Sequence, residues 1–160
     1  MNPVERPSAR AVVTTTDWEV LLIHHRDPAS GRRLWVTPGG GIEPGEDPRE
    51  AIRRELREET GLEHAPDGPL VWTRRVTFPW SGTTVISVES YFWCPVARFD
   101  AHPADLADDD ERASYLGTRW WTLNALAAPH GAWIAPSGLA ALLRSLRDDG
   151  PPPAPIDAGE

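Results

Sequence analysis

Residues 38–62 place a glycine-rich loop directly before a short acidic stretch that has the spacing of a helix. Asp47 followed by Pro48 is a typical helix start, because aspartate caps the first amides and proline fits the first turn. Gly61 suits the left-handed residue that ends many helices. The segment therefore predicts a helix from about Asp47 to Thr60, ended by Gly61 and entered from a loop almost free of side chains.

Three glutamates share one face of this predicted helix. Glu55, Glu58 and Glu59 stand at i, i+3 and i+4, spacings that bring side chains together one turn apart. Such close like charges repel one another, and a divalent cation removes that repulsion by taking carboxylate oxygens as ligands. The preceding glycines permit positive φ and close approach by a ligand. From the residues alone, the alternatives are a metal site and an ordinary solvated acidic face.

The whole segment fits a longer pattern, Gly40, five residues, Glu46, seven residues, and then RELREETGL from Arg54 to Leu62. It resembles the Nudix box of MutT-like Nudix hydrolases, G-x5-E-x7-R-E-U-x-E-E-x-G-U with U aliphatic, and every fixed position is filled. The resemblance implies an α/β (α+β) fold, an α/β/α sandwich around a mixed β-sheet. It also implies hydrolysis of the diphosphate linkage in a nucleoside diphosphate joined to another group, X.

The resemblance assigns roles to individual residues. The metal ligands would be the Gly39 carbonyl and the carboxylates of Glu55, Glu58 and Glu59, holding Mg²⁺, with Mn²⁺ as a substitute. Arg54 would orient a catalytic carboxylate through an ion pair. Glu58 and Glu59 would be the principal ligands, and Glu55 either a further ligand or the group that orients the attacking water. Such a mechanism uses the cation to neutralise phosphate charge and to activate water.

A further glutamate outside the box is expected in this family. Glu111, in the acidic run DDDERAS, is the first candidate, and Glu89, on a predicted strand, is the second. The alternatives are one more charge in an acidic surface loop for Glu111 and the solvent face of a strand for Glu89. Glu46 would assist through a metal-bound water.

Substrate recognition lies outside the box, and no motif of a family subgroup is matched, so the identity of X stays open. The aromatic side chains that would stack on a base, or simply pack in the sheet, are Phe78, Trp80, Tyr91 and Trp93. The basic cluster at 24–26, His-His-Arg, would contact phosphate or form an ordinary exposed strand end.

Composition excludes several classes of protein. The net charge of −8 argues against a general nucleic-acid binder, which needs a basic face. It does not exclude a small phosphate-bearing ligand, such as the small-molecule nucleotide that the resemblance implies as the substrate. No apolar run reaches the roughly 18 residues of a membrane span. The single cysteine, Cys94, and the lack of an apolar signal region at the start predict a cytoplasmic protein. The composition is also compatible with a homodimer.

Local patterns predict a single domain over residues 1–148 and a Pro-rich disordered tail over 149–160. Apolar alternation predicts strands at 9–15, 18–25, 34–37, 70–80, 83–97 and 119–123, with a hairpin turn at Ser81-Gly82, and LNALA and SGLAALLRSLR read as helices.

Two other functions remain open for such a chain. The first is a non-catalytic Nudix-fold module that senses a nucleotide or binds a partner, although such modules usually lose box carboxylates. The second is an isomerase of isoprenoid diphosphates, which Cys94 in an apolar strand fits poorly.

Overall fold

The computed structural model describes residues 2–106 and 108–159. Its strands are β1 Val4–Thr14, β2 Val20–Arg26, β3 Arg33–Val36, β4 Gly39–Gly41, β5 Leu70–Trp80, β6 Thr83–Pro95, β7 Tyr115–Trp121, β8 Ile134–Ala135 and β9 Ile156–Asp157. Its helices are α1 Pro48–Thr60, α2 Asp109–Ser114, α3 Leu123–Ala127 and α4 Leu139–Asp149.

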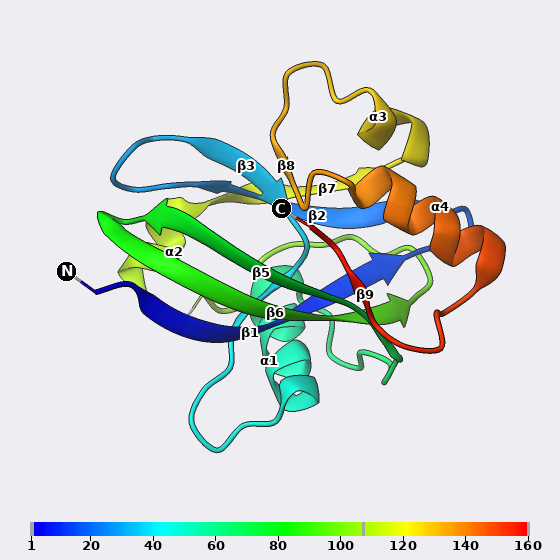
Figure 1. The fold of residues 1–160 in the computed structure, drawn as a ribbon, viewed down its shortest axis with the longest axis horizontal. Coiled ribbons are helices and arrows are strands. Elements are labelled where there is room, and N and C mark those ends of the chain that lie inside the picture. The colour runs from blue at the N-terminus through cyan, green and yellow to red at the C-terminus, as the bar shows by residue number, and fades with distance from the viewer. Residues whose placement is uncertain (1, 107, 160) are drawn as a thin grey trace.

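The strands form one mixed sheet in the order β8-β3-β2-β1-β6-β5-β9, with β4 on β1 and β7 on β2. β1 runs parallel to β6, whereas β5 and β6 form the expected antiparallel hairpin. β1 and β2 pair at Thr14 and Val20, near one end, and then separate toward opposite parts of the sheet (Figure 1). This separation divides the sheet into two halves, one with β1, β6, β5 and β9 and the other with β2, β3, β7 and β8. It leaves room for a pocket between them.

Successive side chains of a strand point to opposite faces of the sheet, and both faces are buried against helices. On one face, residues of β1 and β2 pack against α1: Ala11, Val13 and Leu21 meet Ala51, Ile52 and Leu56. On the other face, α3 and α4 cover the core: Val12, Val20 and Leu22 meet Leu126, Leu139, Leu143 and Leu146 (Figure 1). The layers are helix, sheet and helix, and the predicted α/β/α fold is confirmed.

The predicted start and end of α1 are confirmed. The Asp47 carboxylate accepts hydrogen bonds from the amides of Arg49 and Glu50, and the Glu50 side chain accepts one from the Asp47 amide, completing a capping box. Gly61 ends the helix with φ 77° and donates its amide to Arg57. These caps fix the register of α1 and therefore the directions of its glutamates.

The C-terminal segment differs from the predicted disordered tail. α4 continues to Asp149, and β9 pairs with the edge strand β5. The amide of Ala158 donates to Thr73 O at 2.8 Å, and Ala158 is buried in the core. Residue 160 lies outside the described part. A Pro-rich composition argues against a helix, but an extended chain can still pair with an open sheet edge, which composition does not reveal.

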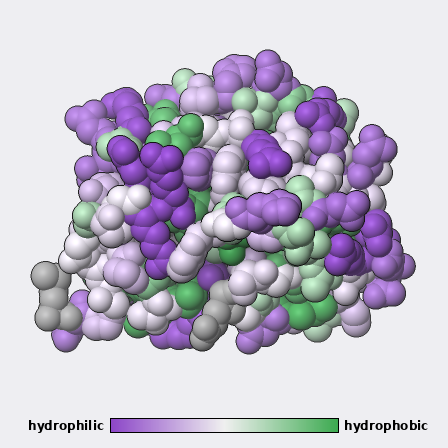
Figure 2. Space-filling view, turned by 90° about the horizontal axis from the view of Figure 1, so that it is seen from above, coloured by the Kyte–Doolittle hydropathy of each residue, from purple (hydrophilic) through white to green (hydrophobic). Residues whose placement is uncertain are grey.

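On the face shown in Figure 2, hydrophobic side chains lie in small patches that are separated by hydrophilic side chains. Of the helices in the described residues, none has the length and apolar character needed to cross a membrane.

Candidate active site

A pocket of about 600 Å³ lies between the two halves of the sheet. One wall comes from β1 and the β5–β6 hairpin, including Arg6, Phe78 and Trp80, and the other from His25 on β2 and Val36 on β3. The box glutamates of α1, the glycines of β4, and Asp108, Asp110 and Glu111 beside them also line it. The sequence elements expected to act together therefore meet in one place.

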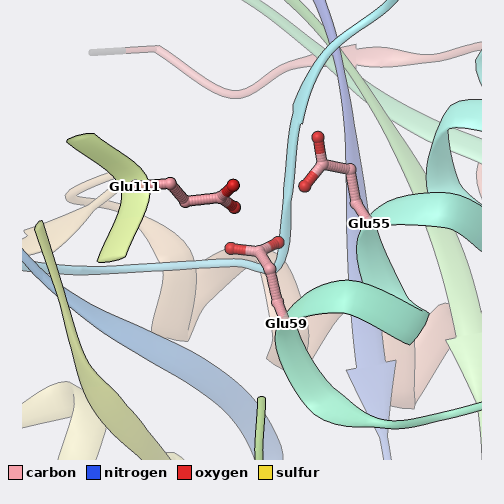
Figure 3. A group of neighbouring side chains, drawn as sticks. All are labelled: Glu55, Glu59 and Glu111. Atoms are coloured by element: carbon pink, nitrogen blue, oxygen red, sulfur yellow. The ribbon is translucent and has the colours of Figure 1, made fainter. Parts of the chain in front are cut away.

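Three carboxylates gather in this pocket. Glu55, Glu59 and Glu111 each place one oxygen within 4.8 Å of the others. Figure 3 shows the side chains of Glu55 and Glu59 leaving α1 and that of Glu111 approaching from α2. Asp108 caps α2 by accepting from the Glu111 amide at 2.8 Å, and this short helix replaces part of the predicted acidic loop. Glu111 therefore lies beside two glutamates of the box, and its catalytic role stays a prediction.

Two carboxylates of this cluster, Glu55 and Glu59, hold protons more strongly than usual. Burial, together with nearby Glu111, raises the pKa of Glu59 from 4.5 to about 8, against the opposing Gly39 amide and Arg10. Burial, together with Glu59, raises the pKa of Glu55 to about 7, although Arg54 opposes the shift. A cation placed among these oxygens would reverse both effects, because it favours the charged forms.

Glu58 lines the same pocket but lies outside the three-carboxylate cluster. Its Oε2 is 3.5 Å from Arg54 Nη1, and no hydrogen bond to this buried oxygen is found within the described residues. A buried carboxylate oxygen without a hydrogen bond, beside three more carboxylates, fits a divalent cation of the Mg²⁺ or Mn²⁺ type, because such cations prefer oxygen ligands. The roles of Glu58 and of its neighbours as ligands stay predictions.

Arg54 links the box residues to one another. Its Nε and Nη2 bond the two oxygens of Glu46 at 2.8 and 2.9 Å, and its Nη1 bonds Glu55 Oε1 at 2.9 Å. Nη2 also donates to the Gly41 carbonyl at 3.0 Å. The ion pair expected of Arg54 is therefore present. Glu46 is held by Arg54, and its proposed action through a metal-bound water remains untested.

The glycine segment forms a short strand, β4, where the sequence predicts a loop. Its backbone pairs with Ser8, Ala9 and Arg10 of β1. Gly39 has φ +137°, and a β-carbon there would lie 2.1 Å from the Ala9 carbonyl oxygen, so only glycine fits. The Gly39 carbonyl accepts a hydrogen bond from Arg10 at 3.1 Å. Its service as a metal ligand stays a prediction.

Glu89 is buried, not on the solvent face of β6, and only 3% of it is exposed. Its carboxylate lies 3.2 Å from Arg74 and 3.7 Å from Arg10. Because Glu89 is outside the three-carboxylate cluster, Glu111 is the better candidate for the additional glutamate.

Of the aromatic and basic side chains considered as contacts for a base or a phosphate, some line the pocket and others pack within the fold. Phe78, Trp80 and His25 line the pocket, and His25 Nε2 is 3.7 Å from Glu59 Oε2. Burial, with Arg10 nearby, lowers the pKa of His25 to about 4, so its imidazole is neutral at pH 7. Side chains that pack within the fold instead are Tyr91, buried in the core, Trp93, stacked on Trp18, and His24, stacked on Trp35.

Two arginines of the pocket were missed in the sequence. Arg6 and Arg10 lie on one face of β1, with Ser8 between them, and all three line the pocket. Their period of two, shared with Ser8, was an available signal, because a polar stripe on an inner strand indicates a functional surface.

Comparisons with known proteins identify the family of the chain. The NUDIX domain family model matches residues 4–142. A curated relative named RNA pyrophosphohydrolase, from Halorhodospira halophila, is 41% identical over 70 residues, which are 44% of this chain and 36% of that protein. The chain thus matches about a third of the length of that relative.

Solved structures resemble the chain along most of its length. A MutT protein from Methanosarcina mazei has a TM-score of 0.64 and 19% identity, covering 93% of this chain and 97% of its own. An Ap4A hydrolase from C. elegans, solved as a binary complex, has a TM-score of 0.58 and 18% identity, covering 89% and 95%. At such identities these likenesses establish the fold alone, while the family model spans most of the sequence. The chain therefore belongs to the NUDIX domain family.

Proposed function

We propose that this protein is a divalent-metal-dependent pyrophosphohydrolase. Its substrate would be a nucleoside diphosphate joined to another group X, which includes nucleoside triphosphates, ADP-ribose-like compounds and dinucleoside polyphosphates. The observation that carries the proposal is the cluster of Glu55, Glu59 and Glu111. These carboxylates come from two separate elements and meet in a pocket of about 600 Å³, within the size range of small-molecule sites.

The chain supplies the groups that such a reaction requires. Glu59, Glu55 and Glu58 would hold the metal, with Mg²⁺ as the expected ion and Mn²⁺ as its substitute. When bound, the cation neutralises phosphate charge and makes water a stronger nucleophile. Glu111 faces the α1 carboxylates from the opposite wall, where it would orient the attacking water or accept its proton. Arg54 keeps Glu55 in place through their 2.9 Å bond.

The remaining pocket walls suit a nucleotide. Phe78 and Trp80 present aromatic rings from the β5–β6 hairpin, where a base can stack. Arg6 lines the pocket from β1, and its side chain comes close to Gly41. A guanidinium at this position would bind a phosphate oxygen that the metal does not reach.

The test is hydrolysis of a substrate panel with Mg²⁺, with Mn²⁺ and with a chelator. The panel contains nucleoside triphosphates, ADP-ribose, dinucleoside polyphosphates, NADH, nucleotide sugars and a 5′-triphosphorylated RNA, the last because of the relative's name. Chromatography of the products identifies the bond that breaks. Metal-dependent turnover of one class supports the proposal and identifies X. Tight nucleotide binding without turnover of any compound would favour a nucleotide-sensing module instead.

A further inference from the structure

Glu89 occupies the middle of β6, between strands that each present an arginine. Arg74 is its direct partner on β5, and Ser8 is its partner on β1, two residues before Arg10. Glu89 Oε2 lies 3.2 Å from Arg74 Nη1, and Oε1 lies 3.7 Å from Arg10 Nε. A buried carboxylate is costly unless it is paired and hydrogen-bonded. The burial of Glu89 therefore points to a role for its carboxylate.

The surroundings keep Glu89 charged. Tyr91 and Ser87 donate their hydroxyls to the two carboxylate oxygens. Burial favours the neutral acid, but Arg10, the Tyr91 hydroxyl and Arg74 together lower the pKa of Glu89 below its ordinary value. The carboxylate therefore remains a fixed anion against which an arginine can be oriented.

Arg10 extends from this anion to the glycine strand. Its Nη1 donates to the carbonyls of Thr37 and Gly39, at 3.2 and 3.1 Å. The amide of Gly39 in turn donates to Glu59 Oε1 at 2.8 Å. A continuous path of contacts thus runs from Glu89 through Arg10 and Gly39 to a carboxylate of the proposed metal site.

We propose that Glu89 and Arg10 are positioning residues that set the Glu59 carboxylate for a divalent cation. The Glu89 carboxylate fixes the position of the Arg10 guanidinium, which in turn holds β4 through its backbone carbonyls. The Gly39 amide then donates to one oxygen of Glu59 and so orients the other oxygen toward the cation. The inference rests on the proposed function, because it assumes that Glu59 binds the cation. A planar guanidinium can contact the carboxylate and two carbonyls at once, which a lysine ammonium on a flexible stem cannot reproduce.

The test compares Glu89→Gln, Arg10→Lys and the double variant with the wild type. Mn²⁺ affinity is measured by electron paramagnetic resonance without substrate, and hydrolysis is measured against Mg²⁺ concentration. Each single change should weaken Mn²⁺ binding about tenfold, as is typical for groups that orient metal ligands. The lost activity should return as Mg²⁺ is raised. The double variant should bind Mn²⁺ no more weakly than the weaker single variant, because both residues act along one path.

Two further variants control for misfolding and for the general effect of removing a charge from β1. Tyr91→Phe removes one donor to Glu89 while keeping the ring, and should give a smaller loss of Mn²⁺ affinity in a folded protein. Glu5→Gln is the matched control, because Glu5 lies on the same strand as Arg10 but forms an exposed pair with Arg75 at 3.0 Å. Its Mn²⁺ affinity should equal that of the wild type.

The outcomes separate this inference from the proposed function. Folded Glu89→Gln and Arg10→Lys proteins that bind Mn²⁺ like the wild type would overturn the positioning role and leave the hydrolase proposal intact. Additive losses in the double variant would also overturn it, because they would show that Glu89 and Arg10 act independently. A wild-type protein that binds no Mn²⁺ would refute the proposed metal site itself.

Discussion

The backbone amide of Gly39 donates a hydrogen bond to Glu59 Oε1 at 2.8 Å, joining the glycine strand β4 to the carboxylate helix α1. The two residues are 20 positions apart in the chain, and the bond is buried. It explains why a strand almost free of side chains precedes the acidic helix. The backbone of β4 must come close enough for an amide to reach the carboxylate.

Replacement of Gly39 by alanine should therefore damage both folding and the site. The added β-carbon would lie 2.1 Å from the Ala9 carbonyl oxygen, at φ +137°, so β4 must move away from β1. We expect a loss of at least about 2 kcal/mol in the free energy of unfolding, measured by urea denaturation. Gly45→Ala is the control, because Gly45 also has positive φ but a β-carbon added there would meet no atom of the described residues within 4 Å. It should cost only about 1 kcal/mol.

Glu59→Gln should separate stability from activity. The amide side chain keeps the oxygen that accepts from Gly39 but loses the negative charge that would bind the cation. We expect hydrolysis to slow by an amount equivalent to about 3–5 kcal/mol, as for other preorganised charge contacts. Metal-free thermal stability at neutral pH should not fall, because burial and the nearby Glu111 already disfavour the charged form of Glu59. Exposed Glu63→Gln is the control, with unchanged rate and stability. A large loss of stability with normal turnover would contradict the assigned role.

The box and its helix could be predicted in detail from sequence because their signals are local. Asp47, Pro48 and Gly61 act through the backbone within one turn, and the spacing of Glu55 and Glu59 fixes their common face. Glu111 became a candidate only through the family resemblance, and its position in the fold was not predicted. Its approach depends on where a distant segment folds back, and a helical period cannot report that.

Several contacts that sequence reasoning missed are made between strands of the sheet. Glu89 was the second candidate for the additional glutamate, with the solvent face of a strand as the alternative, yet Arg10 and Arg74 from two neighbouring strands enclose it. Strand partners more than 70 residues apart, such as Ser8 and Glu89, are set by topology and not by local pattern. The pairing of β9 with β5 escaped prediction for the same reason.

The metal-free protein should lose stability as pH rises from 6.5 to about 8.5. Glu55 and Glu59 have pKa values of about 7 and 8 in the folded state, against an ordinary 4.5, so the folded protein binds more protons in this range. Stability due to a raised pKa is present at low pH and is lost as pH passes the folded value. His25, lowered from 6.5 to about 4, acts in the opposite direction but only below pH 6.5.

Calorimetry with a chelator should record this loss as a falling Tm. Added Mg²⁺ should raise Tm more at the alkaline end, because the cation binds the charged carboxylates. Glu59→Gln is the informative control, since it removes the group with the higher pKa and should flatten the slope. An unchanged slope in that variant would assign the pH dependence to other groups.

Arg54→Lys should impair activity although it keeps the positive charge. Arg54 contacts both oxygens of Glu46, one oxygen of Glu55 and the Gly41 carbonyl, and a lysine cannot make these contacts together. We expect kcat to fall about tenfold or more, as for other groups that orient metal ligands. Arg53→Lys is the control on the same helix, because Arg53 forms an exposed pair with Asp67 at 2.8 Å. Exposed pairs contribute little, so its kinetics should match the wild type.

Trp80→Ala should weaken substrate binding more than it slows chemistry. Trp80 lines the pocket from the β5–β6 hairpin, on a different element from those that carry the clustered carboxylates. Loss of base stacking typically costs about 1–3 kcal/mol, so KM should rise about tenfold or more while kcat stays near the wild-type value. Trp133→Ala is the control, because Trp133 is 59% exposed and lines a separate pocket with Arg32 and His24. Steady-state kinetics on the substrate identified in the panel test this prediction. An unchanged KM in Trp80→Ala would indicate that the base contacts another wall of the pocket.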